Sequence, residues 1–142
     1  MSGIMATAEI DVHVTPDRVW TALTVPAQIE KYMFGAKVTT DWVPGSPITW
    51  AGEYEGRAYE DKGQVLDVQP GLQLQVSHYS PLSGQPDVPA NYHTLTYLLA
   101  PRGRDTTHVT LRQDNNRSED EARHSAENWS AMLGGLKDYL EN

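Results

Sequence analysis

The sequence has 142 residues, no cysteine and a formal net charge of −8. This length fits one domain over residues 1–142, and a chain without cysteine has no disulfides, thiolate metal sites or thiol nucleophiles. Lys and Arg are scattered rather than gathered on a basic face, so we do not expect nucleic-acid binding. No apolar run approaches the ~20 residues of a membrane span. The N-terminus shows no signal-peptide pattern, so we expect a cytoplasmic protein.

The first forty residues predict a strand followed by two short helices. Apolar and polar residues alternate from Ala8 to Val14, which indicates a strand with one buried face. Pro16 and Pro26 suit the first turn of a helix, so we predict short helices over residues 16–23 and 27–32.

Strand patterns then follow one another along the middle of the chain. We predict strands over residues 37–40, 46–52, 57–68, 72–79, 93–99 and 108–113. The alternation fails between Val65 and Val68, which predicts a β-bulge near Leu66 and Asp67. The loop over residues 80–90 is longer than most hairpin loops, and it is typical either of a lid or of a proline-stiffened connection.

The chain closes with a long helix that begins at Ser118. Apolar residues recur at steps of four and three, at Ala122, Ala126, Trp129, Leu133, Leu136 and Leu140. This spacing places one apolar stripe along the helix, and Ser118 with Glu121 is the signature of a capping box. Because the stripe must be buried against a broad surface, we predict an α+β fold. In it, a curved antiparallel sheet wraps around the long C-terminal helix, two short helices follow the first strand, and a cavity lies between sheet and helix.

Two histidines stand out among the polar residues. His78 and His93 fall on the apolar faces of the strands that flank the long loop, so antiparallel pairing can bring them together. They can anchor a ligand or act as an acid/base pair, because imidazole titrates near neutral pH. The alternative is a pair of histidines at the rim of the sheet. His13, His108 and His124 fall on outward faces, and we expect them to be exposed to solvent.

Aromatic and other large side chains supply candidates for a cavity lining, although the same spacings also fit an ordinary core. These candidates are Trp50, Tyr54, Tyr59, Tyr92, Tyr97, Trp129, Met132 and Phe34. The acidic run from Glu53 to Asp61 is interpreted as a solvated sheet surface. The sequence has no His-Glu-x-x-His motif, no Gly-x-Ser-x-Gly turn and no phosphate-binding loop, so we expect neither a metal site nor a cofactor.

Several segments, taken together and in order, carry a resemblance to a known family. They are TPDRVWTALT (15–24), DWVPGSP (41–47), GQVLDV (63–68) with Leu72, TTHVTL (106–111), and WSAML (129–133) with LK (136–137). The chain resembles the START-like (Bet v 1-like, SRPBCC) superfamily, and within it the bacterial single-domain relatives of the activator of Hsp90 ATPase, the AHSA1-like group. The resemblance implies a helix-grip fold that binds apolar or amphipathic small molecules between sheet and helix.

We therefore expect a binding module for a small hydrophobic or amphipathic molecule. The alternatives are a cyclase- or hydrolase-type enzyme that uses His78 or His93, and a protein-interaction module related to the Hsp90 activator. A cavity of at least ~300 Å³ reaching both histidines favours the first two, and a filled core favours the third. In the eukaryotic co-chaperone a separate N-terminal domain carries much of the chaperone contact, so we do not expect Hsp90 as a partner. The sequence leaves a homodimer open.

Overall fold

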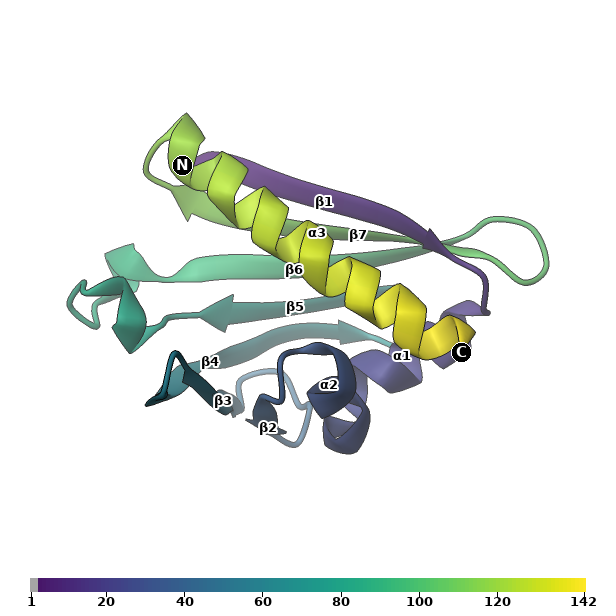
Figure 1. The fold of residues 1–142 in the computed structure, drawn as a ribbon, viewed down its shortest axis with the longest axis horizontal. Coiled ribbons are helices and arrows are strands. Elements are labelled where there is room, and N and C mark those ends of the chain that lie inside the picture. Colours follow the sequence, from purple (N-terminus) through teal and green to yellow (C-terminus); the bar gives the residue numbers. More distant parts are fainter. Residues whose placement is uncertain (1–2) are drawn as a thin grey trace.

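A computed structural model describes residues 3–142, except for the side chain of Tyr54. Its strands are β1 (Ile4–Val12), β2 (Lys37–Thr39), β3 (Pro47–Tyr54), β4 (Arg57–Gln69), β5 (Gln73–His78), β6 (His93–Pro101) and β7 (Thr107–Asn116). Within the described residues, these seven strands form one antiparallel sheet in the order β1-β7-β6-β5-β4-β3-β2 (Figure 1).

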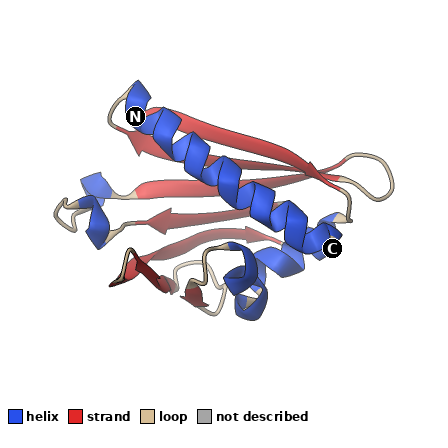
Figure 2. Ribbon diagram, in the orientation of Figure 1, coloured by secondary structure: helices blue, strands red, loops and turns tan. Residues whose placement is uncertain are grey.

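The helices gather on one face of this sheet. Helices α1 (Pro16–Thr24) and α2 (Pro26–Tyr32) follow β1, and α3 (Glu119–Glu141) follows β7. The loop between β5 and β6 contains two short 3-10 turns, η1 (Pro81–Ser83) and η2 (Pro89–Asn91). Helix α3 runs diagonally across the sheet, with α1 and α2 at one end of the same face (Figures 1 and 2). The predicted α+β helix-grip fold is confirmed. None of the helices in residues 3–142 has the length and hydropathy that crossing a membrane requires.

The predicted β-bulge in β4 is also confirmed. Val65 pairs with Val76, but the next paired residue, Asp67, stands opposite Gln75, so Leu66 is the extra residue. Strands β1 and β7 are longer than predicted, because Ile4 at the start of β1 pairs with Asn116 at the end of β7.

Helix α3 buries the predicted apolar stripe against the sheet. Leu133 and Leu136 are fully buried, and each contributes about 1.5–3 kcal/mol through removal of its side chain from water. At the helix start, the hydroxyl of Ser118 accepts a 3.0 Å hydrogen bond from the Glu121 N–H. The Glu121 carboxylate accepts from the Arg117 N–H at 2.6 Å, one residue earlier than in a standard capping box.

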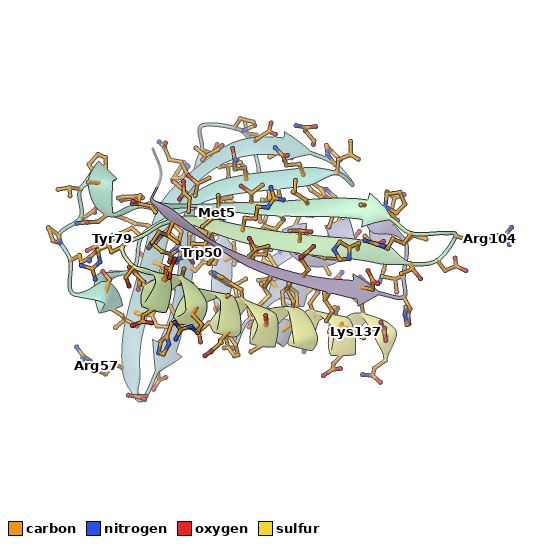
Figure 3. All side chains as sticks on the ribbon, turned by 90° about the horizontal axis from the view of Figure 1, so that it is seen from above. Met5, Trp50, Arg57, Tyr79, Arg104 and Lys137 are labelled. Carbon is orange, nitrogen blue, oxygen red and sulfur yellow. The ribbon has the colours of Figure 1, made fainter. Side chains whose placement is uncertain are left out.

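Strand β4 pairs with β3 along its first part and with β5 along its last part, and Gly63 lies where these two pairings meet. A Cβ atom at this position would lie 1.8 Å from the carbonyl oxygen of Ser77 on β5, so only glycine fits without displacing the backbone. The Gln64 N–H donates to the Ser77 hydroxyl at 2.8 Å rather than to a backbone carbonyl. The tip of the β3–β4 hairpin, marked by Arg57 in Figure 3, turns toward the α3 side of the sheet.

Candidate functional site

A cavity of about 130 Å³ lies between the sheet and the helices. Its lining is formed by Met33, Ala36, Trp50, Tyr59, Asp61, His78, Leu95, Tyr97 and Trp129. We call this space the inner cavity. It is slightly smaller than an engineered protein cavity of about 150 Å³ that binds benzene, so it suits a group no larger than one ring. Figure 3 shows Trp50 among the side chains between sheet and α3.

The inner cavity contains a hydrogen-bonded carboxylate–imidazole pair. The ring N–H at Nε2 of His78 donates to Oδ2 of Asp61 at 2.8 Å, and the two side chains are only 17% and 15% exposed. Trp50, the cross-strand partner of Asp61, contacts the His78 ring edge to face with centroids 5.0 Å apart. The interpretation of Asp61 as part of a solvated surface is therefore wrong, because this carboxylate faces the interior.

The other oxygen of the Asp61 carboxylate has no hydrogen bond. Oδ1 is buried, and nothing in the described part of the chain donates to it. A buried acceptor without a donor costs about 1–3 kcal/mol, and more when it is charged. Stability alone therefore does not explain this arrangement.

A second, polar cavity of about 250 Å³ lies under the loop between β5 and β6. It is lined by His78, Ser80, Ser83, Gln85, Asn91, His93, Gln113, Arg117 and Glu121. We call it the outer cavity. His78 and His93 pair directly across β5 and β6, which confirms the predicted juxtaposition of their backbones. Neither the inner nor the outer cavity alone reaches the ~300 Å³ set as the criterion for ligand binding.

A buried network fixes the aromatic wall of the inner cavity. The indole N–H of Trp129 donates to Oε1 of Gln113 at 2.7 Å. The amide nitrogen of Gln113 donates to Oδ1 of Asn116 at 3.1 Å and to the hydroxyl of Ser125 at 3.2 Å. Gln113 is 7% exposed and Asn116 is 2% exposed, so this network links β7 to α3 away from water. Trp129 is thereby held in one orientation toward the cavity.

The predicted cavity residues separate into several groups. His78, Trp50, Tyr59, Tyr97 and Trp129 line the inner cavity, and His93 lines the outer one. Tyr92 lines neither of these cavities, and its ring stacks on Tyr79. Met132 is 1% exposed and belongs to the packed core. The side chain of Tyr54 lies outside the described residues.

Phe34 is 76% exposed, while its neighbour Met33 lines the inner cavity. Phe34 has a φ of 54°, a left-handed conformation that ends α2 and turns its side chain outward. The rim of the cavity is thus formed by Met33 and Ala36 rather than by Phe34.

Both cavity tyrosines stay neutral. Burial raises the pKa of Tyr97, which lies on β6. Burial and the negative charge of Asp61 raise the pKa of Tyr59. These phenols therefore act as hydrogen-bonding and aromatic groups rather than as anions.

Away from the cavities, the prediction that His108 is freely exposed is wrong. Its side chain is 19% exposed and donates to Glu9 at 2.9 Å and to Asp11 at 2.6 Å. These hydrogen bonds raise the pKa of His108 and lower the pKa values of both carboxyl groups. His13 and His124 are exposed, as predicted.

Sequence reasoning overlooked Asp61 as a member of the site. The signal was present, because Asp61 shares its face of β4 with Val65 and lies across the hairpin from Trp50. Its place in an acidic run concealed that alternation. No group of three or more His, Asp or Glu side chains in residues 3–142 is arranged to hold a metal ion.

Comparison with known proteins gives a family match and structural neighbours. The family model described as activator of Hsp90 ATPase homolog 1-like protein matches residues 13–141. The chain is 45% identical to ChR145 from Cytophaga hutchinsonii, with a TM-score of 0.86, covering 100% of this chain and 97% of that one. The Aha1 dimer from Colwellia psychrerythraea is 20% identical with a TM-score of 0.75, over 97% and 96% of the two chains.

A further structural neighbour is DynU16, which is described as a protein in the dynemicin biosynthetic locus. It is 18% identical with a TM-score of 0.80, and the match covers 97% of this chain and 47% of DynU16. At such identities the likeness concerns the fold alone. The comparison with curated proteins found no match.

Proposed function

The chain belongs to the activator of Hsp90 ATPase homolog 1-like family, and from this premise we propose that it binds a small amphipathic molecule between its sheet and α3. The observation that carries the proposal is that His78 lines both the mainly apolar inner cavity and the polar outer cavity. Because the two cavities adjoin at this side chain, the proposed molecule places its apolar group in the inner cavity and its polar end in the outer one.

The two cavities suit different parts of such a molecule. The inner cavity offers the rings of Trp50, Tyr97 and Trp129 to a group the size of one ring. The outer cavity offers His93 and Arg117 to a polar or anionic end. The Arg117 side chain is 71% exposed, so the polar end would lie near solvent, where its desolvation costs least.

The loop over the outer cavity is held by its own contacts. The Tyr79 hydroxyl donates to the carbonyl of Gln85, and the Asn91 amide donates to the carbonyl of Pro86 at 2.8 Å. Because Gln85 and Asn91 also line the outer cavity, a ligand there would contact a pre-formed wall, which lowers the entropy cost of binding.

The test uses the dye 1-anilinonaphthalene-8-sulfonate, which combines a single phenyl ring, a naphthalene and an anionic sulfonate. We expect saturable one-to-one binding, measured by dye fluorescence. Ala36→Leu places a larger side chain in the inner cavity and should weaken binding at least tenfold. Ala51→Leu on the outward face of β3 is the matched control and should bind like the wild type. Equal affinity of wild type and Ala36→Leu would refute binding in the inner cavity.

A further inference from the structure

The hydrogen bond between Asp61 and His78 leaves one nitrogen of the imidazole ring free. Because the Nε2–H of His78 donates to Oδ2 of Asp61, Nδ1 of the neutral ring carries a lone pair. No residue in the described part of the chain donates a hydrogen bond to Nδ1, and this atom is not enclosed. Among the described side chains that are not exposed, the one nitrogen or oxygen atom both enclosed and unpaired is Oδ1 of Asp61. His78 therefore presents an accessible base to the cavities that it lines.

Asp61 supports the uptake of a proton by this ring. Its carboxylate holds the imidazole in one tautomer, and it stabilises the imidazolium that forms when Nδ1 accepts a proton. The side chains of Asp61 and His78 are 15% and 17% exposed, so their attraction acts largely away from water, where it is stronger. A carboxylate that orients an imidazole with a free nitrogen is the arrangement of a general base.

The position of His78 indicates which atoms of a ligand it reaches. In the proposed binding mode a ring lies in the inner cavity and a polar end in the outer cavity, so the atoms that connect them lie beside His78. An imidazole removes a proton from carbon most readily where a neighbouring carbonyl takes up the negative charge. The hydroxyl of Tyr97, in the inner cavity, has no described hydrogen-bond partner and is not enclosed, so it can donate to such an oxygen.

We propose that the protein catalyses proton transfer next to a carbonyl, in a 2-oxo acid that carries an aromatic ring on carbon 3. Nδ1 of His78 removes a proton from carbon 3, the C–H electron pair forms a C=C bond with carbon 2, and the carbonyl π pair moves to oxygen. The same nitrogen returns the proton to that oxygen, which gives the enol without a co-reactant. His78 is the catalytic residue, Asp61 is its positioning residue, and Tyr97 stabilises the oxyanion. This inference rests on the proposed binding function and adds a reaction to it.

The experiment follows the exchange of the carbon 3 protons of phenylpyruvate for deuterium in D₂O by proton NMR, because this exchange reports proton removal directly. We expect the full chain to accelerate exchange at least hundredfold over free imidazole at the same concentration, since a positioned general base contributes about 10²–10⁴-fold. No acceleration over free imidazole would overturn the proposal, whether or not any variant folds.

The variant His78→Gln removes the base and keeps a polar side chain. We expect the exchange rate to fall about hundredfold. His124→Gln is the matched control, because His124 is exposed on α3 and lines neither cavity, and it should exchange like the wild type. Equal rates for wild type and a folded His78→Gln would refute the role of His78.

The variant Asp61→Asn tests the positioning role. Its amide is neutral and does not stabilise the imidazolium. We expect the exchange rate of bound phenylpyruvate to fall at least tenfold, with the affinity from isothermal titration calorimetry within twofold of wild type. Weaker affinity with an unchanged rate for the bound molecule would contradict positioning and leave Asp61 a structural residue.

The outcomes separate this inference from the broader function. If the naphthalene dye binds in the inner cavity and the exchange of phenylpyruvate is not accelerated, the catalytic assignment fails and the binding function stands. If neither the dye nor phenylpyruvate binds, both fail.

Discussion

Replacement of Gly63 by alanine tests whether the close approach of β4 and β5 shapes the sheet. The added Cβ would lie 1.8 Å from the Ser77 carbonyl oxygen, whereas ordinary contact begins near 3.4 Å. The two strands must therefore separate locally by more than about 1 Å, a displacement that neighbouring hydrogen bonds of normal length cannot absorb.

The hydrogen bonds that this separation would break set the expected loss of stability. Lys62 and Tyr79 exchange two backbone bonds of 3.0 and 2.8 Å, and the Gln64 N–H donates to Ser77 at 2.8 Å. At about 1 kcal/mol each, their loss lowers the free energy of unfolding by about 3 kcal/mol. For a domain of this size, the midpoint of thermal unfolding should fall by about 10 °C.

The assay is urea unfolding followed by far-UV circular dichroism, with Gly134→Ala as the matched control. Gly134 lies inside α3, and a Cβ there meets nothing within 4 Å among the described atoms. Alanine at this position should raise the free energy of unfolding by about 0.5–1 kcal/mol, since glycine is unfavourable inside a helix. The same substitution is thus expected to have opposite signs at the two sites. A Gly63→Ala protein within 1 kcal/mol of wild type would refute the reasoning.

Two further predictions concern the N-terminus of α3 and the His108 cluster. Ser118→Ala removes the helix N-cap and should lower the free energy of unfolding by about 1 kcal/mol in the same urea assay, with Ser118→Asp close to wild type. His108→Gln should lower the unfolding temperature most at about pH 5.5 and least at pH 9. The raised pKa of His108 means that its stabilisation is complete below pH 6.5 and is lost as the pH rises through the raised value. The lowered pKa values of Glu9 and Asp11 mean that the stabilisation from these two carboxylates is present above pH 4.5 and is lost in acid. A difference between the two proteins that does not vary with pH would contradict this account.

The predictions from sequence succeeded where a periodic pattern determines the structure. The stripe that includes Leu133 and Leu136 predicted α3 and the face that it buries, because residues that recur every 3.6 positions fall on one face of an α-helix. The loss of alternation after Val65 located the bulge in β4 for the same reason. Both features follow from residues close in the chain.

The candidate site was harder to predict, because its geometry depends on turns and on contacts between distant segments. Phe34 was expected to line the cavity, but the left-handed turn at this residue exposes its side chain, and periodicity carries no information about such a turn. Asp61 meets His78 because Gly63 lets β4 and β5 approach closely. The distance of 1.8 Å between a Cβ atom built on Gly63 and the backbone of β5 reveals this close approach. It can be known only when both strands have been placed in three dimensions.

The pairing of β1 with β7 also constrains how the protein is made on the ribosome. His108 lies 97 residues after Asp11, its partner across these strands, and α3 follows later still. At 5–20 residues per second, β1 waits on the order of 5–20 s after its synthesis before its partner strand emerges. During translation, the apolar face of β1 thus remains without its native partner strand for that time.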